Sequence, residues 1–449
     1  MATASDPSQP AHPRRGALAW ALYEAGRTPY FVLVNIYVFA PYFTGVVVGD
    51  PVRGQTIWGL VTAAAAVLTA LLAPVLGAAA DAGGRRKPWL LAMTAVAVPA
   101  MMLLWTARPG ATLLWPIVAL IAAGSAFELS VVFHNALLTQ VAAPERIGRL
   151  SGLSFAGGNL ATLAVLAVFT FFLSPRLDAA AHAPERSAGL LAAAWFALLS
   201  VPLFVWTPDA PPSGRPLGAA VRDGLGRLRR TLGELPRHRE IARYLLARMI
   251  FNDGFLVILY FAGVYAGGLF SWRAETLTVF GVLSTLAAVA GGVLGGWLDD
   301  RFGSRRTLLG AVAVGFFCMI VTLTTGPGRI LGVEVAVAAG APPLSTAPEL
   351  VFLANAAVCT VAILAGIASS RSFVARLAPP GMTAEFFGLF ALSGNAVAFL
   401  GPLSVSLATA ASGGQRGGFA VVLVFLGAGG ALLLRVRDDG RAPALQPAS

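Results

Sequence analysis

Apolar residues form long runs along this chain, and short polar segments separate them. A helix rises about 1.5 Å per residue, so a run of about 20 apolar residues spans the hydrocarbon core of a bilayer. About twelve such runs occur, which predicts an all-α, polytopic membrane protein with twelve transmembrane helices. The predicted spans are 17–42, 55–80, 88–106, 112–137, 151–173, 188–206, 243–268, 275–298, 307–325, 349–370, 386–410 and 417–434.

The longest polar stretch, 207–242, separates the first six predicted spans from the last six. We therefore expect two six-helix bundles, at 17–206 and 243–435, with tails at 1–16 and 436–449. Within the linker, leucine and valine recur at steps of three and four while arginines fall between them, which predicts a basic amphipathic helix. This helix is either a linker on the inner leaflet or a regulatory helix that binds a partner.

Charge separates this chain from soluble proteins and sets its expected orientation. Only 12% of its residues are charged, against about 25% in a soluble domain. Most of the Lys and Arg residues lie in the segments that face the cytoplasm if both termini are placed there. The net charge of +11 is therefore read as a signal of topology, and we expect no nucleic-acid partner. The scattered histidines and the two cysteines inside spans predict neither a metal site nor a disulfide.

Two segments at matching places in the two halves resemble each other. The stretch "GAAADAGGRRKPWLL" at 77–91 aligns without a gap with "GWLDDRFGSRRTLLG" at 296–310, and each joins the second and third spans of its half. A second pair, "SGLSFAGGN" from Ser151 and "FGLFALSGN" from Phe387, aligns at a larger offset. That change places an insertion in the second half, expected between Gly328 and Pro348. Duplicated halves with repeated inner loops are typical of secondary transporters.

The repeated glycine, aspartate, glycine and arginine pattern resembles the signature loop of the major facilitator superfamily. One departure is Ala82, which stands where a basic residue often follows the aspartate. The stretches "WALYEAGRTPYF", "LLARMIFNDG" and "SRSFVARLAPPGMTAEFFGLFALSGN" resemble the autophagy-related vacuolar effluxer-like branch over nearly the whole chain. Further departures are Glu24, where the branch usually has an aspartate, and the segment 135–142 at the inner end of span four.

The signature loops are candidates for a conformational latch. A carboxylate at the inner end of one helix can bind arginines of its own loop and the free N–H groups at the start of another helix. The resemblance implies that Asp81 faces the start of span eleven and Asp300 the start of span five, in the state closed on the inside. The alternative is that these charges only fix topology and turn geometry. The predicted latch residues are Gly77, Asp81, Gly84, Arg85, Arg86, Gly296, Asp300, Arg301, Gly303 and Arg305.

Ionisable residues inside the spans are the candidates for a solute or ion site. Each Arg or Asp at a helix centre costs roughly 2.5–3.5 kcal/mol on insertion scales, so such residues are expected to face a cavity. They gather in spans one, four, seven and ten, which the resemblance implies line the central cavity. The predicted cavity residues are Glu24, Arg27, Glu128, Asn135, Arg248, Asn252, Asp253 and Arg371.

Helical spacing predicts how the cavity residues of the first half are grouped. Glu24 and Arg27 are three residues apart, so they share a face and are close enough to pair. Glu128 and Asn135 are seven apart and form a polar stripe. His134 lies off the face of Glu128, so we expect a packed or inner-mouth histidine there rather than a proton relay.

Helical spacing groups fewer of the predicted cavity residues in the second half. Arg248 and Asn252 share a face, whereas Asp253 points elsewhere and is expected to find a partner on another helix, with Arg27 or Arg371 as candidates. Arg248 is either a cavity residue or a side chain that reaches the inner interface. Arg371 is expected to mark the end of its helix.

These patterns predict a secondary transporter in a bacterial cytoplasmic membrane that moves a small polar solute, most simply an amino acid or similar zwitterion. Arginines would bind its carboxylate and acids its ammonium group. A buried carboxyl can load and release a proton, so proton coupling through Asp253 or Glu128 is a further expectation. The sequence contains no GxxxxGK[ST] loop, which disfavours a primary pump. We expect no enzyme activity and no cofactor, and the protein should act as a monomer. The alternatives are an exporter of amphipathic compounds and a receptor or scaffold that has lost transport.

Overall fold

The computed structural model confirms an almost entirely helical protein. It describes residues 13–141, 144–209, 218–219, 222, 226, 233, 238–338, 340–377, 389–390, 393–394 and 396–437. Within these residues, eleven helices are long and apolar enough to cross a membrane, and a twelfth apolar helix, Leu400–Ser412, is shorter. The chain forms two compact units: unit 1 contains Met1–Phe39 and Leu68–Arg227, and unit 2 contains Ala40–Val67 and Leu228–Ser449.

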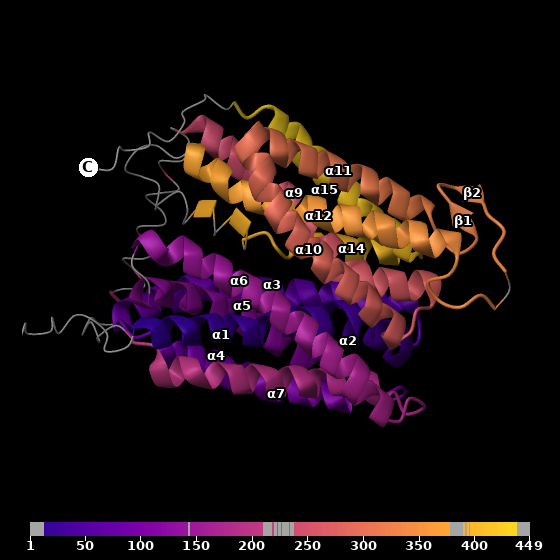
Figure 1. Cartoon of the computed structure of the whole chain (residues 1–449), viewed down its shortest axis with the longest axis horizontal. Helices are drawn as coiled ribbons and strands as arrows, with labels where there is room; N and C mark the ends of the chain where they lie inside the picture. Colours follow the sequence, from indigo (N-terminus) through magenta and orange to yellow (C-terminus); the bar gives the residue numbers. More distant parts are fainter. Residues whose placement is uncertain are drawn as a thin grey trace, which may run out of the picture. The chain divides into compact units, whose positions relative to one another are not determined.

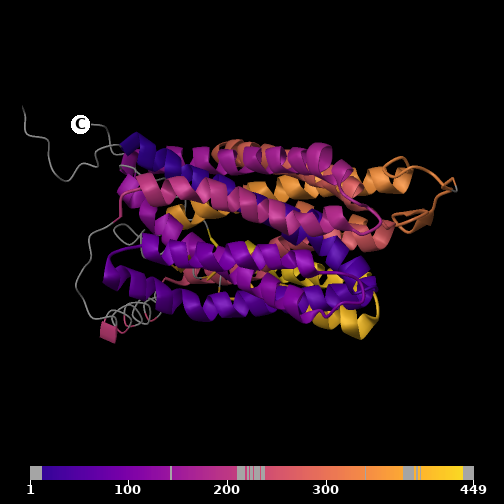
Figure 2. The same ribbon diagram turned by 90° about the horizontal axis from the view of Figure 1, so that it is seen from below.

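Unit 1 is built around its first helix. Helix α1 lies against α5, α6 and α7, while α4 lies against α5 and α7 (Figures 1 and 2). Aromatic rings fill the interior, where Phe127 stacks on Tyr30 with ring centroids 4.2 Å apart and lies 4.8 Å from Phe196. The elements are α1 (Pro13–Tyr30), a π-helical stretch (Phe31–Tyr37), the second part of α3 (Pro51–Gly83), α4 (Lys87–Leu103), a 3₁₀ turn (Leu104–Thr106), α5 (Leu114–Val141), α6 (Pro144–Ala167), a π-helical stretch (Val168–Leu173), a 3₁₀ turn (Ser174–Arg176) and α7 (Ala183–Trp206).

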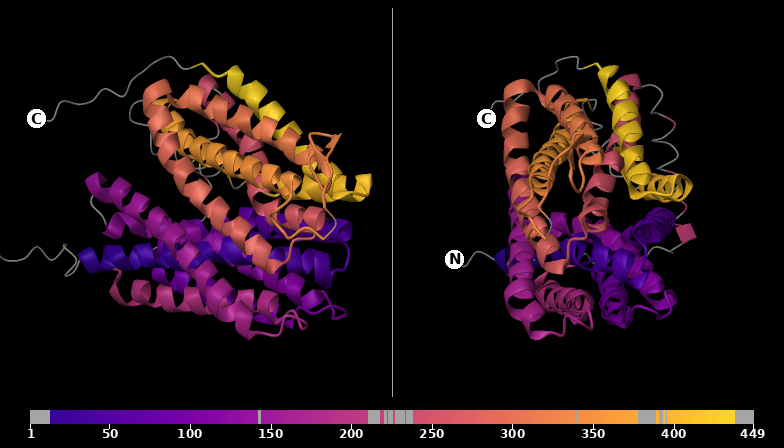
Figure 3. Two further views of the ribbon diagram at one scale, coloured as in Figure 1. Left: turned by 45° about the vertical axis from the view of Figure 1, so that its right-hand side comes forward. Right: turned by 90° about the vertical axis from the view of Figure 1, so that its right-hand side faces the viewer.

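Unit 2 contains the remaining helices and one β-hairpin. Helix α12 lies against α10 and α11, and α9 lies against α15 (Figure 3). The hairpin pairs Arg329 with Glu334 between α11 and α12, where the insertion was expected. The elements are α2 (Phe39–Tyr42), a π-helical stretch (Phe43–Val47), the first part of α3, α9 (Arg239–Phe270), α10 (Ala274–Phe302), α11 (Ser304–Thr324), β1 (Arg329–Ile330), β2 (Val333–Glu334), α12 (Ala347–Leu377), α14 (Leu400–Ser412) and α15 (Gln415–Leu434).

Small residues let α10 and α12 approach closely. A Cβ atom on Gly291 would lie 2.6 Å from the Val361 carbonyl oxygen, and one on Gly295 would lie 2.6 Å from the Ala365 Cα. The four-residue spacing of the two glycines places both on one face of α10. Backbone contact of this kind replaces the hydrophobic driving force that lipid-embedded helices lack.

A reciprocal cap fixes the start of α12. The Thr346 hydroxyl donates to Glu349 Oε2 at 2.7 Å, and the Thr346 N–H donates to the same oxygen at 3.3 Å. The other Glu349 oxygen accepts the indole N–H of Trp272 at 2.6 Å. Buried Glu349 is therefore a capping residue. In the sequence T-x-x-E at a helix start, the threonine and glutamate side chains each accept the free backbone N–H of the other residue.

The first part of α3 belongs to unit 2, although the sequence places it in the first predicted bundle. Gln55 Nε2 donates to the Thr409 hydroxyl at 2.8 Å and to the Gln415 carbonyl at 3.1 Å. The Ser406 hydroxyl donates to the Thr56 carbonyl at 2.8 Å. Residues 40–67 are thus tied to α14 and the start of α15.

Parts of the predicted architecture fall outside the described residues. These are most of the amphipathic helix expected in 207–242, residues 1–12, and residues 438–449.

Candidate functional site

An ion pair near the end of α1 forms the centre of the candidate site in unit 1. Arg27 Nη2 lies 2.6 Å from Glu24 Oε1, and Arg27 Nε donates to Glu24 Oε2 at 3.2 Å. The pair that the three-residue spacing predicts is therefore present and bidentate. The two side chains are 12% and 21% exposed, so the pair is shielded but still reachable. A π-helical stretch begins at Phe31, and such irregular turns are frequent at functional sites.

Glu128 places a second carboxylate near this pair. It lies half-buried on α5, and among the described residues it makes no hydrogen bond or ion pair. Its charge interacts with those of Arg27 and Glu24 at longer range. Because Glu24 already neutralises Arg27, the Glu128 carboxylate is the uncompensated charge of this group.

His134 completes the group, although the sequence predicted a packed or inner-mouth histidine there and did not count it among the cavity residues. Its ring is 4.3 Å from that of Trp20 and nearly parallel to it, and its Nδ1 is 3.8 Å from Glu24 Oε2. His134 projects from α5 about one third of a turn around the helix from Glu128. Its ring contacts Trp20 and Glu24 of α1. The aromatic residues Trp20, one turn before Glu24, and Tyr23, directly before it, were the available signal of a ring-lined pocket.

Arg248 is the corresponding positive group in unit 2. Its Nη1 donates to the Phe390 carbonyl at 2.9 Å and to the Ser393 hydroxyl at 2.8 Å, and its guanidinium lies 3.7 Å from the centre of the Phe390 ring. Its Nε is buried and has no partner in the described part of the chain. No carboxylate there pairs with it either. Arg248 is thus held by neutral groups and keeps its positive charge uncompensated.

Asp253 binds the start of a helix rather than an arginine. Its side chain is 2% exposed, and Oδ2 accepts the N–H of Gly401, the second residue of α14, at 3.2 Å. The expected partner on another helix is therefore present, but it is α14 and not Arg371, since Asp253 forms no ion pair within the described residues of unit 2. The pair with Arg27 of unit 1 stays a prediction. The partial positive charge at a helix N-terminus compensates the carboxylate instead.

We expect Asp253→Ala to destabilise the protein by about 0.5–2 kcal/mol, the usual loss when a capping side chain is removed. Asp253→Asn should lose less, because its amide oxygen can still accept the Gly401 N–H. Thermal unfolding of the two purified variants in detergent measures the difference. Equal unfolding midpoints would show that the contact contributes no stability.

The other predicted cavity residues are less enclosed. Asn135 is exposed on α5, so the stripe it was expected to share with Glu128 does not extend to a buried amide. Asn252 is half-buried and makes no hydrogen bond to any described residue. Arg371 is exposed and lies within α12, which continues to Leu377, so the prediction that it marks the helix end is wrong.

Comparison with known proteins decides the family. The family model described as "Vacuole effluxer Atg22 like" matches residues 42–442. The chain belongs to this family. An uncharacterized MFS-type transporter of Bacillus subtilis, YxiO, is 23% identical over 424 residues, with 91% of this chain and 92% of that protein covered. Autophagy-related protein 22 of Cryptococcus neoformans is 29% identical over 298 residues, and the match covers 62% of this chain and only 50% of that protein.

Solved structures show the same fold at low sequence identity. A D-xylose-proton symporter superposes with a TM-score of 0.66 at 12% identity, covering 94% of this chain and 97% of the symporter. A POT family transporter in complex with 5-aminolevulinic acid gives 0.66 at 14% identity, covering 95% and 98%. This member of the Atg22-like family is therefore a membrane transporter of the MFS type and not an enzyme.

The first signature loop of this Atg22-like transporter binds the end of its own unit. The backbone N–H groups of Arg86 and Lys87 donate to the two carboxylate oxygens of Asp209, at 2.8 and 3.1 Å. Lys87 Nζ donates to the Thr207 carbonyl at 2.9 Å. Asp209 therefore caps the start of α4. Arg85 is exposed, Gly77 faces Val132 on α5, and the side chain of Asp81 lies outside the described residues.

The second signature loop also binds the end of its own unit, but it does so through an arginine side chain. Arg305 donates to the carbonyl oxygens of Leu434 and Val436 at 2.9 and 2.8 Å, at the end of α15. Gly84 and Gly303 both have positive φ, +75° and +83°, so they end α3 and α10 in matching turns that favour glycine. These contacts favour a role for the glycines and Arg305 in turn geometry and helix capping within each unit.

The two aspartates of the second loop differ in their surroundings. Asp300 is exposed and pairs with none of the described residues, and Arg301 and Gly296 beside it are also open. Its neighbour Asp299 is buried and lies 3.9 Å from Arg376 at the end of α12. Asp300 is therefore the acid of this loop that is available to a further partner.

We expect Asp209→Ala to lower stability by about 0.5–2 kcal/mol, because two N–H groups at the start of α4 lose their acceptor. The measurement is again the unfolding midpoint, with Asp178→Asn on the exposed loop before α7 as the control. An unchanged midpoint for Asp209→Ala would contradict the assigned cap.

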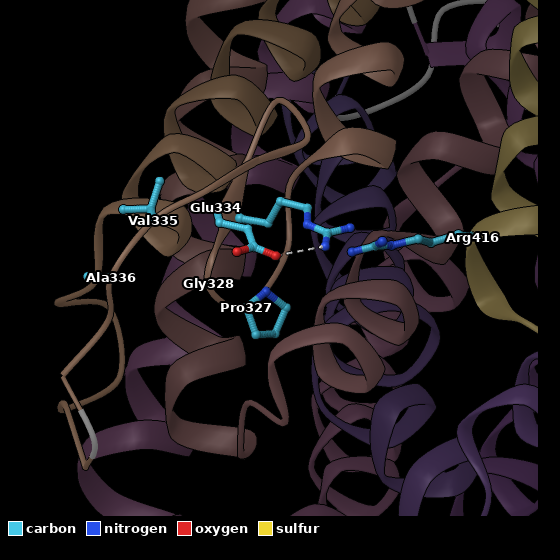
Figure 4. Close-up of a pocket in the computed structure, with 7 residues that line it drawn as sticks. Pro327, Gly328, Glu334, Val335, Ala336 and Arg416 are labelled. Carbon is cyan, nitrogen blue, oxygen red and sulfur yellow. Dashed lines mark ion pairs between the residues drawn. The ribbon is translucent and has the colours of Figure 1, made fainter.

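A pocket beside the β-hairpin lies apart from these charges. Figure 4 shows Arg416 pointing toward the ion pair of Arg329 and Glu334, whose Nη2 and Oε1 are 3.6 Å apart. Glu334 is 86% exposed, so solvent screens the pair strongly. The lining residues are Pro327, Gly328, Arg329, Glu334, Val335, Ala336 and Arg416. This is a surface feature of unit 2 without the buried polar groups found around Arg27 and Arg248.

Proposed function

We propose that this transporter moves a small zwitterion, an amino acid or similar solute, and that protons drive the movement. The observation that supports this proposal is one uncompensated charge of each sign in the described residues: Glu128 in unit 1 and Arg248 in unit 2. A free carboxylate suits an ammonium group, and a guanidinium with an unused N–H suits a carboxylate. A zwitterion carries a group of the opposite charge for each kind of residue, which neither a simple cation nor a simple anion does.

Localisation and gating follow as part of the same proposal. We place the protein in a bacterial cytoplasmic membrane with both termini inside, as the distribution of Lys and Arg favours. The two bundles and the monomeric state remain proposals as well. Asp81 and Asp300 are proposed to act as latch carboxylates, and the exposed position of Asp300 leaves it available for this role.

Counterflow in proteoliposomes tests the solute class. Vesicles loaded with an unlabelled amino acid mixture should accumulate a labelled amino acid only when they contain the protein. Arg248→Gln should weaken this exchange, and Asp178→Asn on an exposed loop should not. If no amino acid exchanges while amphipathic cations do, the exporter alternative is correct. Binding of amino acids without exchange would support a receptor.

A further inference from the structure

The proton positions on His134 follow from its neighbours. His134 Nε2 lies 2.9 Å from the carbonyl oxygen of Trp20. A carbonyl oxygen only accepts hydrogen bonds, so Nε2 must carry a hydrogen. The Trp20 indole N–H donates to the His134 carbonyl at 2.7 Å, and Tyr23 stacks on the same ring at 4.9 Å. These contacts hold the ring and leave Nδ1 as its variable nitrogen.

Nδ1 faces a carboxylate. It lies 3.8 Å from Glu24 Oε2, and the histidine side chain is 2% exposed. In the neutral ring Nδ1 presents a lone pair to the carboxylate, and the two groups repel. With a proton on Nδ1 the same geometry is an ion pair. The arrangement therefore has an attractive and a repulsive form that differ by one proton.

We propose that Nδ1 of His134 and the carboxylate of Glu24 form a binding site for one exchangeable proton, which competes with the ammonium group of the solute. The binding step adds a proton from water to the Nδ1 lone pair, and release returns it to water. No other bond changes. The competition with solute rests on the proposed function, whereas the proton site itself does not.

The charges around the ring explain the competition. Glu24 and Arg27 on α1 act on His134 directly, and Glu128 on α5 acts on both of them. A further titratable neighbour on α1 is Tyr23, whose hydroxyl lies 3.4 Å from the Thr94 hydroxyl of α4. From α7, the Phe196 ring lies against Tyr23. With His134 protonated and both acids ionised, the described charges of this group sum to zero. Without that proton the group is negative and attracts an ammonium group instead.

Nitrogen-15 NMR of the histidine-labelled protein tests the proton site without transport. The His134 signals are assigned by their loss in His134→Gln. We expect Nδ1 to change from protonated to bare as the pH rises, while Nε2 stays protonated. In Glu24→Gln the amide cannot provide the opposing charge, so the transition should move or disappear. An Nδ1 that keeps one state throughout, or that titrates identically in Glu24→Gln, would overturn the proposal.

The pH dependence of solute affinity tests the competition. In counterflow with a labelled amino acid, the apparent affinity of the wild type should decrease about tenfold for each unit by which the pH is lowered, over the range in which the site is mostly protonated. His134→Gln should show no such slope, and His182→Gln, at a partly exposed histidine, should keep it. A slope that persists in His134→Gln would refute the competition. Absence of any amino acid exchange would reject the proposed function and leave the NMR result to decide the proton site.

Discussion

Replacement of Glu128 by glutamine is expected to weaken solute binding by about ten- to a hundredfold. Glu128 forms no ion pair or hydrogen bond with the described residues, so a bound ammonium group would gain its charge-assisted hydrogen bond in full. Such bonds contribute about 1.5–3 kcal/mol, and about 1.4 kcal/mol corresponds to a factor of ten. The measurement is the concentration of unlabelled amino acid that half-saturates counterflow.

The matched control is Asp178→Asn, which removes a carboxylate charge from an exposed loop of the same unit. It should leave the half-saturating concentration unchanged. Glu128→Asp keeps the charge but shortens the side chain, and an intermediate value is expected. If Glu128→Gln binds the solute as well as the wild type, the ammonium group is bound elsewhere.

Replacement of Gly295 by alanine is the second change with a large expected effect. The added methyl group would lie 2.6 Å from the Ala365 Cα and 3.1 Å from its carbonyl oxygen, both atoms of rigid backbone. The two helices would have to separate, and overpacking of this kind costs about 1–3 kcal/mol. We therefore expect a clearly lower unfolding midpoint in detergent.

Gly296 provides the control on the same helix, since a Cβ there meets nothing within 4 Å. Gly296→Ala removes the same conformational freedom and adds the same group, so it should be neutral or stabilising by up to about 1 kcal/mol. If both variants unfold at the same temperature as the wild type, the contact between α10 and α12 does not limit stability.

The fold was largely predictable because a bilayer imposes simple rules on a sequence. The length of the apolar runs follows from the thickness of the hydrocarbon core, and the duplicated loops can be recognised by aligning the two halves of the sequence. The ion pair between Glu24 and Arg27 was predictable for a similar reason, because residues three apart on a helix are neighbours.

Contacts between distant segments were not predictable in the same way. Asp253 was expected to pair with an arginine of another helix, but its partner is a backbone N–H at the start of α14. Every residue except proline has a backbone N–H, so the identity of the side chains does not indicate this partner. His134 was judged by its angle to Glu128 on its own helix, whereas its partners Trp20 and Glu24 belong to α1. Asp209 and Arg305 likewise act on helix ends far along the chain. Spacing within one helix contains no information about such partners.

The attachment of residues 40–67 to unit 2 bears on how the polypeptide can be divided. A cut in the 207–242 linker would leave Gln55 and Thr56 on one fragment and their partners Thr409 and Ser406 on the other. The fragments would then share buried hydrogen bonds that neither can satisfy alone, and unsatisfied groups in lipid are costly. Two separately translated pieces should therefore reassemble when expressed together, and each should be degraded when made without the other.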